Sequence, residues 1–218
     1  SKPEIDFYRS LALELERIAI HTGDLSAICT DIAFQLGSSV FGRLRTPIIN
    51  FIQEWGGNRL SKGLIRPGKT QFPFTKELGD RLNEILNDYE PDFNEMCKEL
   101  FKLPSALSRL ERTGTVSYDD VLNIGAVGMS ARMSGLLRDI RTTHPYALYP
   151  QLNHKPILKH HGDVYSRAQI RREEIWQSMA YIRQLLKDIP ESKANYEMPI
   201  KLKPNAFSIS LVEGWRGE

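Results

Sequence analysis

The stretch Leu13–Phe34, LELERIAIHTGDLSAICTDIAF, carries the clearest structural signal in this sequence. Apolar side chains recur within it and beside it at steps of three, four and seven, namely Leu11, Leu15, Ile18, Leu25, Cys29, Ile32 and Leu36. These steps place them on one stripe of a helix that runs from Asp6 to about Leu36. Gly37 and the two serines after it predict the end of this helix. The pattern indicates a fold built on long packed helices.

Two more helices are predicted in the first half of the chain. One covers Val40–Trp55 and ends at a pair of glycines. Residues 58–74, NRLSKGLIRPGKTQFPF, are rich in Gly, Pro and Lys, which is typical of an ordered loop. Thr75 is a good N-cap for the next helix, which has a long apolar face. We expect Pro91 to kink or split this helix and Pro104 to end it.

The second half of the chain differs in character. Residues 112–156 are rich in Gly and Pro and predict a mostly irregular segment, with a short helix near Tyr118–Ile124. A last long helix is predicted over Asp163–Ile189. The tail AFSISLVEGW, residues 206–215, alternates apolar and polar side chains as a strand does. We therefore expect a mainly α fold with a Gly/Pro-rich irregular segment and a small C-terminal β element.

The composition excludes several classes of protein. The 218 residues include 29 Lys and Arg against 27 Asp and Glu, and this net charge of +2 argues against non-specific nucleic-acid binding. No apolar run approaches the roughly 18 residues of a membrane span. The polar start SKPEIDFYRS does not resemble a signal peptide. Two cysteines are too few for a disulfide framework and fit a reducing compartment. We expect a cytoplasmic protein.

The same two cysteines bear on metal binding. Nickel–iron and iron–sulfur sites need thiolate ligands, commonly in CxxC pairs. Cys29 and Cys97 lie alone and far apart in the sequence, so we expect small buried apolar side chains and no metal or other cofactor held by this chain. His160 and His161, with His154 nearby, point apart on any regular element, and a solvated pair explains them more simply than a metal site does.

A polar row borders the apolar stripe of the first helix. His21, Asp24 and Asp31 are spaced by three and seven residues and share one face. Carboxylates at the edge of a core have raised pKa values in some proteins and relay protons, which makes these three residues candidates for a pocket or a proton path. The plainer alternative is a helix surface with two solvated acids and an ordinary histidine.

A second candidate cluster lies in the irregular segment. The sequence RMSGLLRDIRTTHPY places Arg132, Arg138 and Arg141 around Asp139. Arginines in a Gly-rich loop fix neighbouring carboxylates by paired hydrogen bonds, or they bind an anion. An internal ion-pair network that stiffens the loop is the structural alternative, and neither common Gly-rich phosphate-binding pattern is present to favour an anion.

Several segments together resemble one protein family, and they follow its order over nearly the whole chain. The segments are LELERIAIHTGDLSAICTDIAF, NRLSKGLIRPG at residues 58–68, the passage GTVSYDDVLNIGAVGMSARMSGLLRDIRTTHPYALY at 114–149, GDVYSRAQIRREEIWQSM at 162–179, and VEGWRGE at 212–218. They are similar to the large subunits of energy-converting nickel–iron hydrogenases, such as the formate hydrogenlyase type. That family includes the homologous D-type subunit of respiratory complex I. VEGWRGE and HTGDLSAIC resemble the hydrogenase side.

The resemblance implies a single truncated domain over residues 1–218, the central part of such a large subunit. The parent would be a hydrogenase-like oxidoreductase that couples proton and hydrogen chemistry to ion pumping, while this part alone would be inactive. Its nickel–iron centre would be held by two CxxC pairs, neither of which is in this chain. An iron–sulfur small subunit would dock alongside, at the inner face of the cell membrane. We also expect self-association, because missing segments would leave the first helix uncovered.

The resemblance gives roles to two further positions. Asp31 maps onto the acid that lies beside the quinone-binding histidine in complex I. Ser61 stands where the complex I proteins have a histidine that tunes an iron–sulfur cluster. Two alternatives to the hydrogenase-like function stay open: a component of an NADH:quinone oxidoreductase that lines the quinone chamber, and a non-catalytic helical scaffold.

Overall fold

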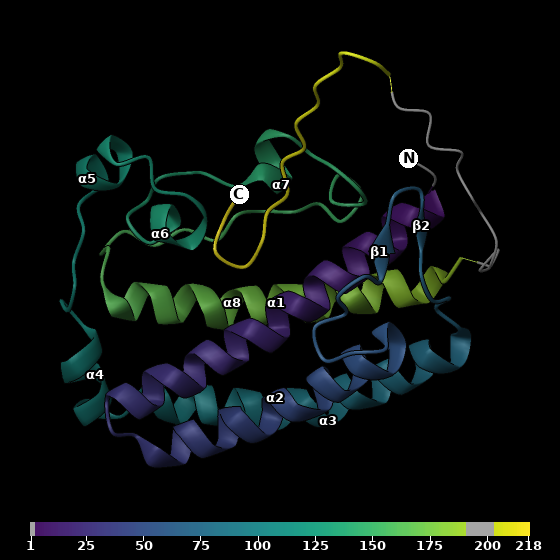
Figure 1. Ribbon diagram of the computed structural model, residues 1–218. Helices are drawn as coiled ribbons and strands as arrows, with labels where there is room; N and C mark the ends of the chain where they lie inside the picture. Colours follow the sequence, from purple (N-terminus) through teal and green to yellow (C-terminus); the bar gives the residue numbers. More distant parts are fainter. Residues whose placement is uncertain (1–2, 191–202) are drawn as a thin grey trace.

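Four long helices form the body of the molecule (Figure 1). The structure is a computed structural model that describes residues 3–190 and 203–218. The long helices are α1 (Pro3–Asp31), α2 (Gln35–Gly56), α3 (Lys76–Leu100) and α8 (Val164–Leu185). Helix α1 packs against both α2 and α8, and α3 packs against the same two helices. This arrangement confirms the mainly α fold.

The first helix ends earlier than its apolar stripe predicts. Ala33 has a positive φ of 60°, and the amide of Phe34 donates to the carbonyl of Cys29 over 2.8 Å, as in a Schellman motif. A Cβ on Gly37 would lie 2.6 Å from the Phe34 ring and 2.8 Å from Cys29 Sγ. Gly37 therefore allows α2 to approach the end of α1, and its prediction as a helix end was wrong. Leu36 accordingly belongs to α2 and is 59% exposed.

The apolar stripe of α1 forms the centre of the hydrophobic core. Leu11, Leu15, Ile18 and Leu25 are completely or almost completely buried. They belong to one cluster with apolar side chains of the other three long helices, among them Phe41, Ile48, Leu82, Phe93, Ile175 and Ile182. Burying each such side chain stabilises the fold by about 1.5–3 kcal/mol. From Leu11 to Cys29 the stripe is covered within the chain, whereas Leu36 at its end is exposed, and self-association stays a prediction.

Helix α3 begins as predicted but tolerates its proline. The hydroxyl of Thr75 caps the helix by accepting from the amide of Leu78 over 3.3 Å. The helix runs unbroken past Pro91 and does not split there. Pro91 is exposed, so water can solvate the carbonyl that its missing N–H leaves free. Pro104 stands in the first turn of α4 (Pro104–Leu110), a favourable position for proline.

The β structure lies at a different place from the one expected. Strands β1 (Ile65–Arg66) and β2 (Lys69–Thr70) pair antiparallel inside the predicted loop, with Ile65 opposite Thr70. The tail at residues 206–215 forms no strand within the described part of the chain, so the C-terminal β element was wrongly placed. Alternating side chains suit a strand, but a strand needs a neighbouring backbone, and no described segment pairs with this tail in that way.

The Gly/Pro-rich segment covers the α1–α8 side of the bundle (Figure 1). As predicted, it is mostly irregular, and the predicted short helix is α5 (Tyr118–Asn123). Two further short helices, α6 (Gly128–Arg132) and α7 (Ile140–Thr143), were not predicted. Gly128 has a φ of 58°, and a Cβ there would lie 2.2 Å from the carbonyl oxygen of Arg216. This close approach lets the C-terminal tail pack onto α6. The last helix is confirmed as α8 followed by the turn η1 (Leu186–Asp188).

Candidate functional site

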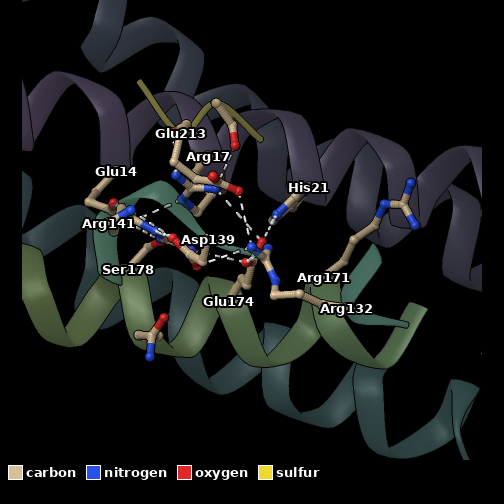
Figure 2. A network of polar contacts seen from close by, with 12 residues as sticks. Glu14, Arg17, His21, Arg132, Asp139, Arg141, Arg171, Glu174, Ser178 and Glu213 are labelled. Atoms are coloured by element: carbon tan, nitrogen blue, oxygen red, sulfur yellow. Dashed lines mark hydrogen bonds and ion pairs between the residues drawn. The ribbon is translucent and has the colours of Figure 1, made fainter. Parts of the chain in front are cut away.

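A network of charged side chains fills the interior between α1 and α8 (Figure 2). None of its members is more than 2% exposed. They are Glu14, Arg17 and His21 of α1, Arg132 of α6, Asp139 and Arg141 at α7, Glu174 and Ser178 of α8, and Glu213 of the tail. Charges so deep in a protein are tolerated where they are paired and hydrogen-bonded.

Helix periodicity brings these side chains into the interior. Glu14, Arg17 and His21 follow one another at steps of three and four, so they form a row on one side of α1. Glu174 and Ser178 stand four residues apart and form a similar row on α8. The two rows face each other because α1 and α8 pack together. Each row lies among buried apolar residues and therefore cannot reach solvent.

Glu174 is the centre of the network. One carboxylate oxygen accepts from Arg132 Nη2 at 2.5 Å and from Arg141 Nη2 at 3.3 Å. The other oxygen is 2.6 Å from Nε2 of His21. Burial alone would raise the pKa of Glu174, but the Arg132 guanidinium and the hydrogen bond to His21 hold this pKa well below its ordinary value. Glu174 is therefore ionised in the interior.

Asp139 is held by two arginines and a histidine. Arg141 donates to both of its oxygens, from Nε at 2.9 Å and from Nη2 at 2.7 Å, and Arg132 Nη1 donates at 3.0 Å. Nε2 of His154 is 3.0 Å away, and Nδ1 of the same ring lies 2.9 Å from the Tyr181 hydroxyl. Burial opposes ionisation of Asp139, but these partners lower its pKa below the ordinary value. Burial lowers the pKa of His154.

Glu14 completes the network near the start of α1. It accepts from the hydroxyl of Ser178 at 2.5 Å and from that of Tyr149, and it pairs with Arg17 Nε at 3.4 Å. Burial would raise the pKa of Glu14, yet Arg17 and Arg141 lower it below the ordinary value. Another buried carboxylate is thus kept charged by arginine.

Glu213 attaches the C-terminal tail to this interior. Its Oε1 accepts from Arg132 Nη1 at 3.0 Å, and its Oε2 accepts from the amide of Ile140 at 3.0 Å. The carbonyl oxygens of Glu213 and Gly214 accept from the two terminal nitrogens of Arg17 at 3.0 and 3.1 Å. The tail is therefore held through both its backbone and its one buried carboxylate.

His21 differs from the arginines of the network because its ring can gain or lose a proton near neutral pH. Nε2 lies against Glu174, whereas Nδ1 is buried without a hydrogen-bond partner among the described residues. Burial lowers the pKa of His21 below its ordinary value of 6.5, although the hydrogen bond to Glu174 opposes this. The neutral ring must carry its proton on Nε2, because a lone pair there would face a carboxylate.

The chemistry of this network follows from its composition. Arginine does not release its proton in proteins, so the three guanidiniums hold carboxylates ionised but do not pass protons between them. Two hydrogen-bonded pairs remain that can exchange a proton, His21 with Glu174 and His154 with Asp139. The arrangement is thus a cluster of fixed charges in which two buried histidines are the groups able to exchange a proton.

A separate groove of about 660 Å³ lies along a neighbouring face of α1. Its walls come from α1, α2, the loop that carries β1, and the tail. Its floor is apolar and includes Leu13, Ile20, Ile49 and Leu64, while Arg9, Arg59 and Arg66 supply positive charge. Burial in this wall raises the pKa of Glu16, which Arg17 partly offsets. Ser61 also lines the groove.

The sequence profile described as "Respiratory-chain NADH dehydrogenase, 49 Kd subunit" matches residues 31–211 of this chain. The chain belongs to this family. Its match includes the groove loop, α8 and the network members from Arg132 to Ser178, whereas the row Glu14, Arg17 and His21 precedes it and Glu213 follows it.

Individual relatives include proteins of NADH-quinone oxidoreductases and a hydrogenase. The chain is 32% identical to the C/D-type subunit of an NADH-quinone oxidoreductase of Phocaeicola vulgatus, over 98% of this chain and 41% of that protein. It is 28% identical to the D-type subunit of the same kind of enzyme from Clostridium beijerinckii, over 97% and 58%. It is 29% identical to the carbon monoxide-induced hydrogenase of Rhodospirillum rubrum, over 99% and 60%. The chain therefore spans about half the length of these relatives.

The residues of this 49 kDa-family chain do not fit a nickel–iron centre. Cys29 and Cys97 are buried, and burial raises the pKa of each thiol to about 12, so neither offers a thiolate at neutral pH. Across residues 3–190 and 203–218, His, Cys, Asp and Glu form no group of three or more suited to a metal. No helix in that part of the chain is long and apolar enough to cross a membrane.

The predicted site residues fall in three places. Arg132, Asp139 and Arg141 join His21 in the network, in agreement with the interpretation of the arginines as an internal ion-pair cluster. Arg138 lies outside it and pairs with Glu218 at the surface, at 3.0 Å. Asp24 pairs with Arg171 at 3.1 Å, next to the network.

Asp31 is placed apart from the other two members of its predicted row. It is exposed at the last residue of α1, and ten residues of helix separate it from His21 by about 15 Å. The structure thus does not bring the pocket candidates His21, Asp24 and Asp31 to one site. A role for Asp31 in the complete protein stays a prediction.

Sequence reasoning missed four carboxylate and guanidinium members, namely Glu14, Arg17, Glu174 and Glu213. A signal for the first two was present, because Glu14 and Arg17 stand among Leu11, Leu15 and Ile18, at positions that α1 turns toward the core. Charged residues in an apolar stripe indicate buried partners elsewhere in the chain. The partners on α8 and in the tail could not be paired with them without the fold.

Proposed function

We propose that this chain is the central part of the large subunit of a hydrogenase-like, energy-converting oxidoreductase. The observation that carries the proposal is membership of the 49 kDa family, with relatives that include both an NADH-quinone oxidoreductase protein and a carbon monoxide-induced hydrogenase. In such an enzyme, redox chemistry would drive ion pumping across a membrane. The complete large subunit would be peripheral, on the cytoplasmic face.

The groove is the surface that we assign to an iron–sulfur small subunit. The loop with Arg59, Ser61 and Arg66 forms one wall, and it is the loop whose sequence resembles the family segment near an iron–sulfur cluster. An apolar floor with a charged rim is the usual composition of an interface. A partner seated there would lie against α1, with the charge network on a neighbouring face of the same helix.

The chain's own part in the reaction would be electrostatic. The network holds four carboxylates and three arginines around His21 inside the domain that backs the groove. Fixed charges in a dry interior act more strongly than they do in water and do not reorganise during a reaction. Nickel and iron, which would carry the hydrogen chemistry, need thiolates from residues outside this chain.

One observation favours a second candidate, a quinone-type reaction. The matching profile is named for an NADH dehydrogenase, and that reaction needs no nickel. Asp31 maps onto the acid beside the quinone site in the resemblance, and it is exposed at the end of α1, where another segment could cover it.

The proposal is tested in the complete large subunit, expressed with its iron–sulfur partner. Ile20→Glu should remove the partner from the purified complex, because it places a charge on the groove floor. Ile124→Glu is the matched control, since Ile124 is 74% exposed and lies outside the groove. Hydrogen-dependent and quinone-dependent electron transfer are then measured on the wild-type complex. Activity with neither substrate, or a partner retained by the Ile20 variant, would reject the assignment.

A further inference from the structure

The charges of the network do not balance. Among the described residues, the three arginines Arg17, Arg132 and Arg141 face four carboxylates, those of Glu14, Asp139, Glu174 and Glu213. One negative charge is therefore left without a cation in the interior. An uncompensated buried charge is unfavourable, and two histidines in contact with these carboxylates can gain a positive charge, namely His21 on Glu174 and His154 on Asp139.

We propose that His21 is a reversible proton-binding site and that Glu213, the carboxylate which the tail inserts, is the positioning residue that sets its proton affinity. With Glu213 in place the interior has one excess negative charge, and a proton on His21 neutralises it. With Glu213 withdrawn, three arginines face three carboxylates, and the His21 ring binds a proton less tightly. This concerns the chain itself and does not rest on the reaction proposed above.

The geometry of the ring makes both of its states accessible. Nε2 donates to Glu174 over 2.6 Å in the neutral and in the charged form alike. The difference between the two forms lies at Nδ1, which has no partner among the described residues. Nδ1 is an unsatisfied acceptor in the neutral ring and an unsatisfied donor in the charged ring. Neither form is therefore favoured by hydrogen bonding at Nδ1, and the surrounding charge decides between them.

Charged and titratable groups face His21 from each element around it. Glu174 favours the charged ring, whereas Arg17 and Arg171 oppose it. Farther groups act through direct contacts with these residues: Arg132 and Arg141 on Glu174, and Asp24 on Arg171. The carboxylate of Glu213 contacts Arg132, and its backbone carbonyl accepts from Arg17. From the other side, α2 brings Arg45 to the carbonyl of Ala19, and α3 brings the Tyr89 hydroxyl to Thr22.

The tail links this site to the groove. Residues Ser210, Leu211 and Val212 line the groove, and the next residue is Glu213. The amide of Glu213 donates to the hydroxyl of Tyr146 over 3.0 Å, and Tyr146 lines the groove as well. A molecule that moves this wall must therefore move Glu213. Occupancy of the groove and protonation of His21 are thus coupled, and each must affect the other by the same factor.

The test is a pH titration of His21 by NMR on the chain labelled at histidine. In wild type we expect a midpoint below 6.5, and in Glu213→Gln a midpoint lower by about one pH unit, which is a tenfold loss of proton affinity. Glu213→Asp should restore part of the shift. Glu218→Gln, which removes the tail's surface pair with Arg138, is the matched control and should leave the midpoint unchanged. A folded Glu213→Gln chain with the wild-type midpoint would overturn the proposal.

A second measurement needs no substitution. The amide of Ile140 donates to Glu213, so its hydrogen exchange reports withdrawal of the carboxylate. By reciprocity, protection of this amide, corrected for intrinsic exchange, should rise by up to about tenfold as pH falls through the His21 midpoint. Protection that is constant or that falls across this midpoint would contradict the coupling even if the Gln variant does not fold.

Discussion

Nε2 of His21 and Oε2 of Glu174 lie 2.6 Å apart, although 153 positions separate the two residues in sequence. This contact joins α1 to α8 at the centre of a dry, charged interior. Because both side chains are buried, the pair affects stability, pH response and the attachment of the tail together.

Glu174→Gln should strongly destabilise the chain. The substitution keeps the shape of the side chain but removes the charge that Arg132 and Arg141 share, and breaking a buried ion pair costs about 3–5 kcal/mol. Urea denaturation measures the change. Glu173→Gln is the matched control, because Glu173 pairs with Lys159 at the partly exposed surface and its substitution should cost less than about 1 kcal/mol. Equal effects of the two substitutions would show that the network adds nothing to the fold.

Stability should fall as the pH drops below 6.5. The pKa values of His21 and His154 are lowered in the folded chain, so the unfolded chain binds more protons between 6.5 and these lowered values. More protons on the unfolded state means that stability rises with pH across this window. Denaturation at several pH values measures the slope, and His21→Gln in a folded chain should reduce it. A slope of opposite sign would mean that the histidines are charged in the interior.

Cys29 and Cys97 should be inert to thiol reagents in the folded chain. Burial raises the pKa of each thiol to about 12, and the thiolate is the reactive form. Mass spectrometry after treatment at pH 8 should detect no adduct until denaturant is added. Rapid modification of either cysteine without denaturant would indicate a more open packing of α1 on α2 or α3.

Gly37→Ala should destabilise the chain by about 1–3 kcal/mol, because the new methyl group overlaps the Phe34 ring and Cys29 Sγ. Gly42→Ala is the matched control on the same helix, where the nearest atom is Ser26 Oγ at 3.5 Å. There the substitution should be neutral or stabilise the helix by up to about 1 kcal/mol. Thermal unfolding compares them, and a neutral Gly37→Ala would show that α2 does not approach α1 closely.

Asp31→Asn distinguishes a functional acid from a surface acid. In this chain the change should leave stability unaltered or raise it by about 0.5 kcal/mol, since a negative charge at a helix C-terminus is unfavourable. In the complete protein, a proton-path role predicts normal assembly with lower turnover, because the amide cannot ionise. Unaltered turnover in the assembled enzyme would make Asp31 an ordinary surface residue.

The helices of this fold were predictable because their cause is local. Spacing of apolar residues determined the buried stripe of α1, and Thr75 marked the start of α3. The turn at Ala33 was missed because its left-handed conformation is stabilised by contacts between two helices, and alanine gives no sign of it. The tail alternates like a strand, yet pairing depends on a neighbour that its own sequence cannot specify.

The candidate site was predictable only in part. Arg132, Asp139 and Arg141 stand close together in the sequence, so their association could be inferred, and His21 was singled out for its place on the helix. Glu174 and Glu213 come from distant segments, and nothing in their local sequence distinguishes them from solvated acids. For Asp31 the sequence predicted an association that the structure does not have. Asp31 shares a helix face with His21 but does not contact the partners of His21.

The hydrogen bond from Arg17 to the carbonyl of Gly214 spans 197 positions and has a consequence for synthesis on the ribosome. At about 5–20 residues per second, Arg17 is synthesised roughly 10–40 s before Gly214. For most of that interval α1 lacks α8, and for all of it α1 lacks the tail, so the guanidinium of Arg17 is without its buried partners. The nascent chain should therefore engage a chaperone along α1, and release should follow translation of Glu213 and Gly214.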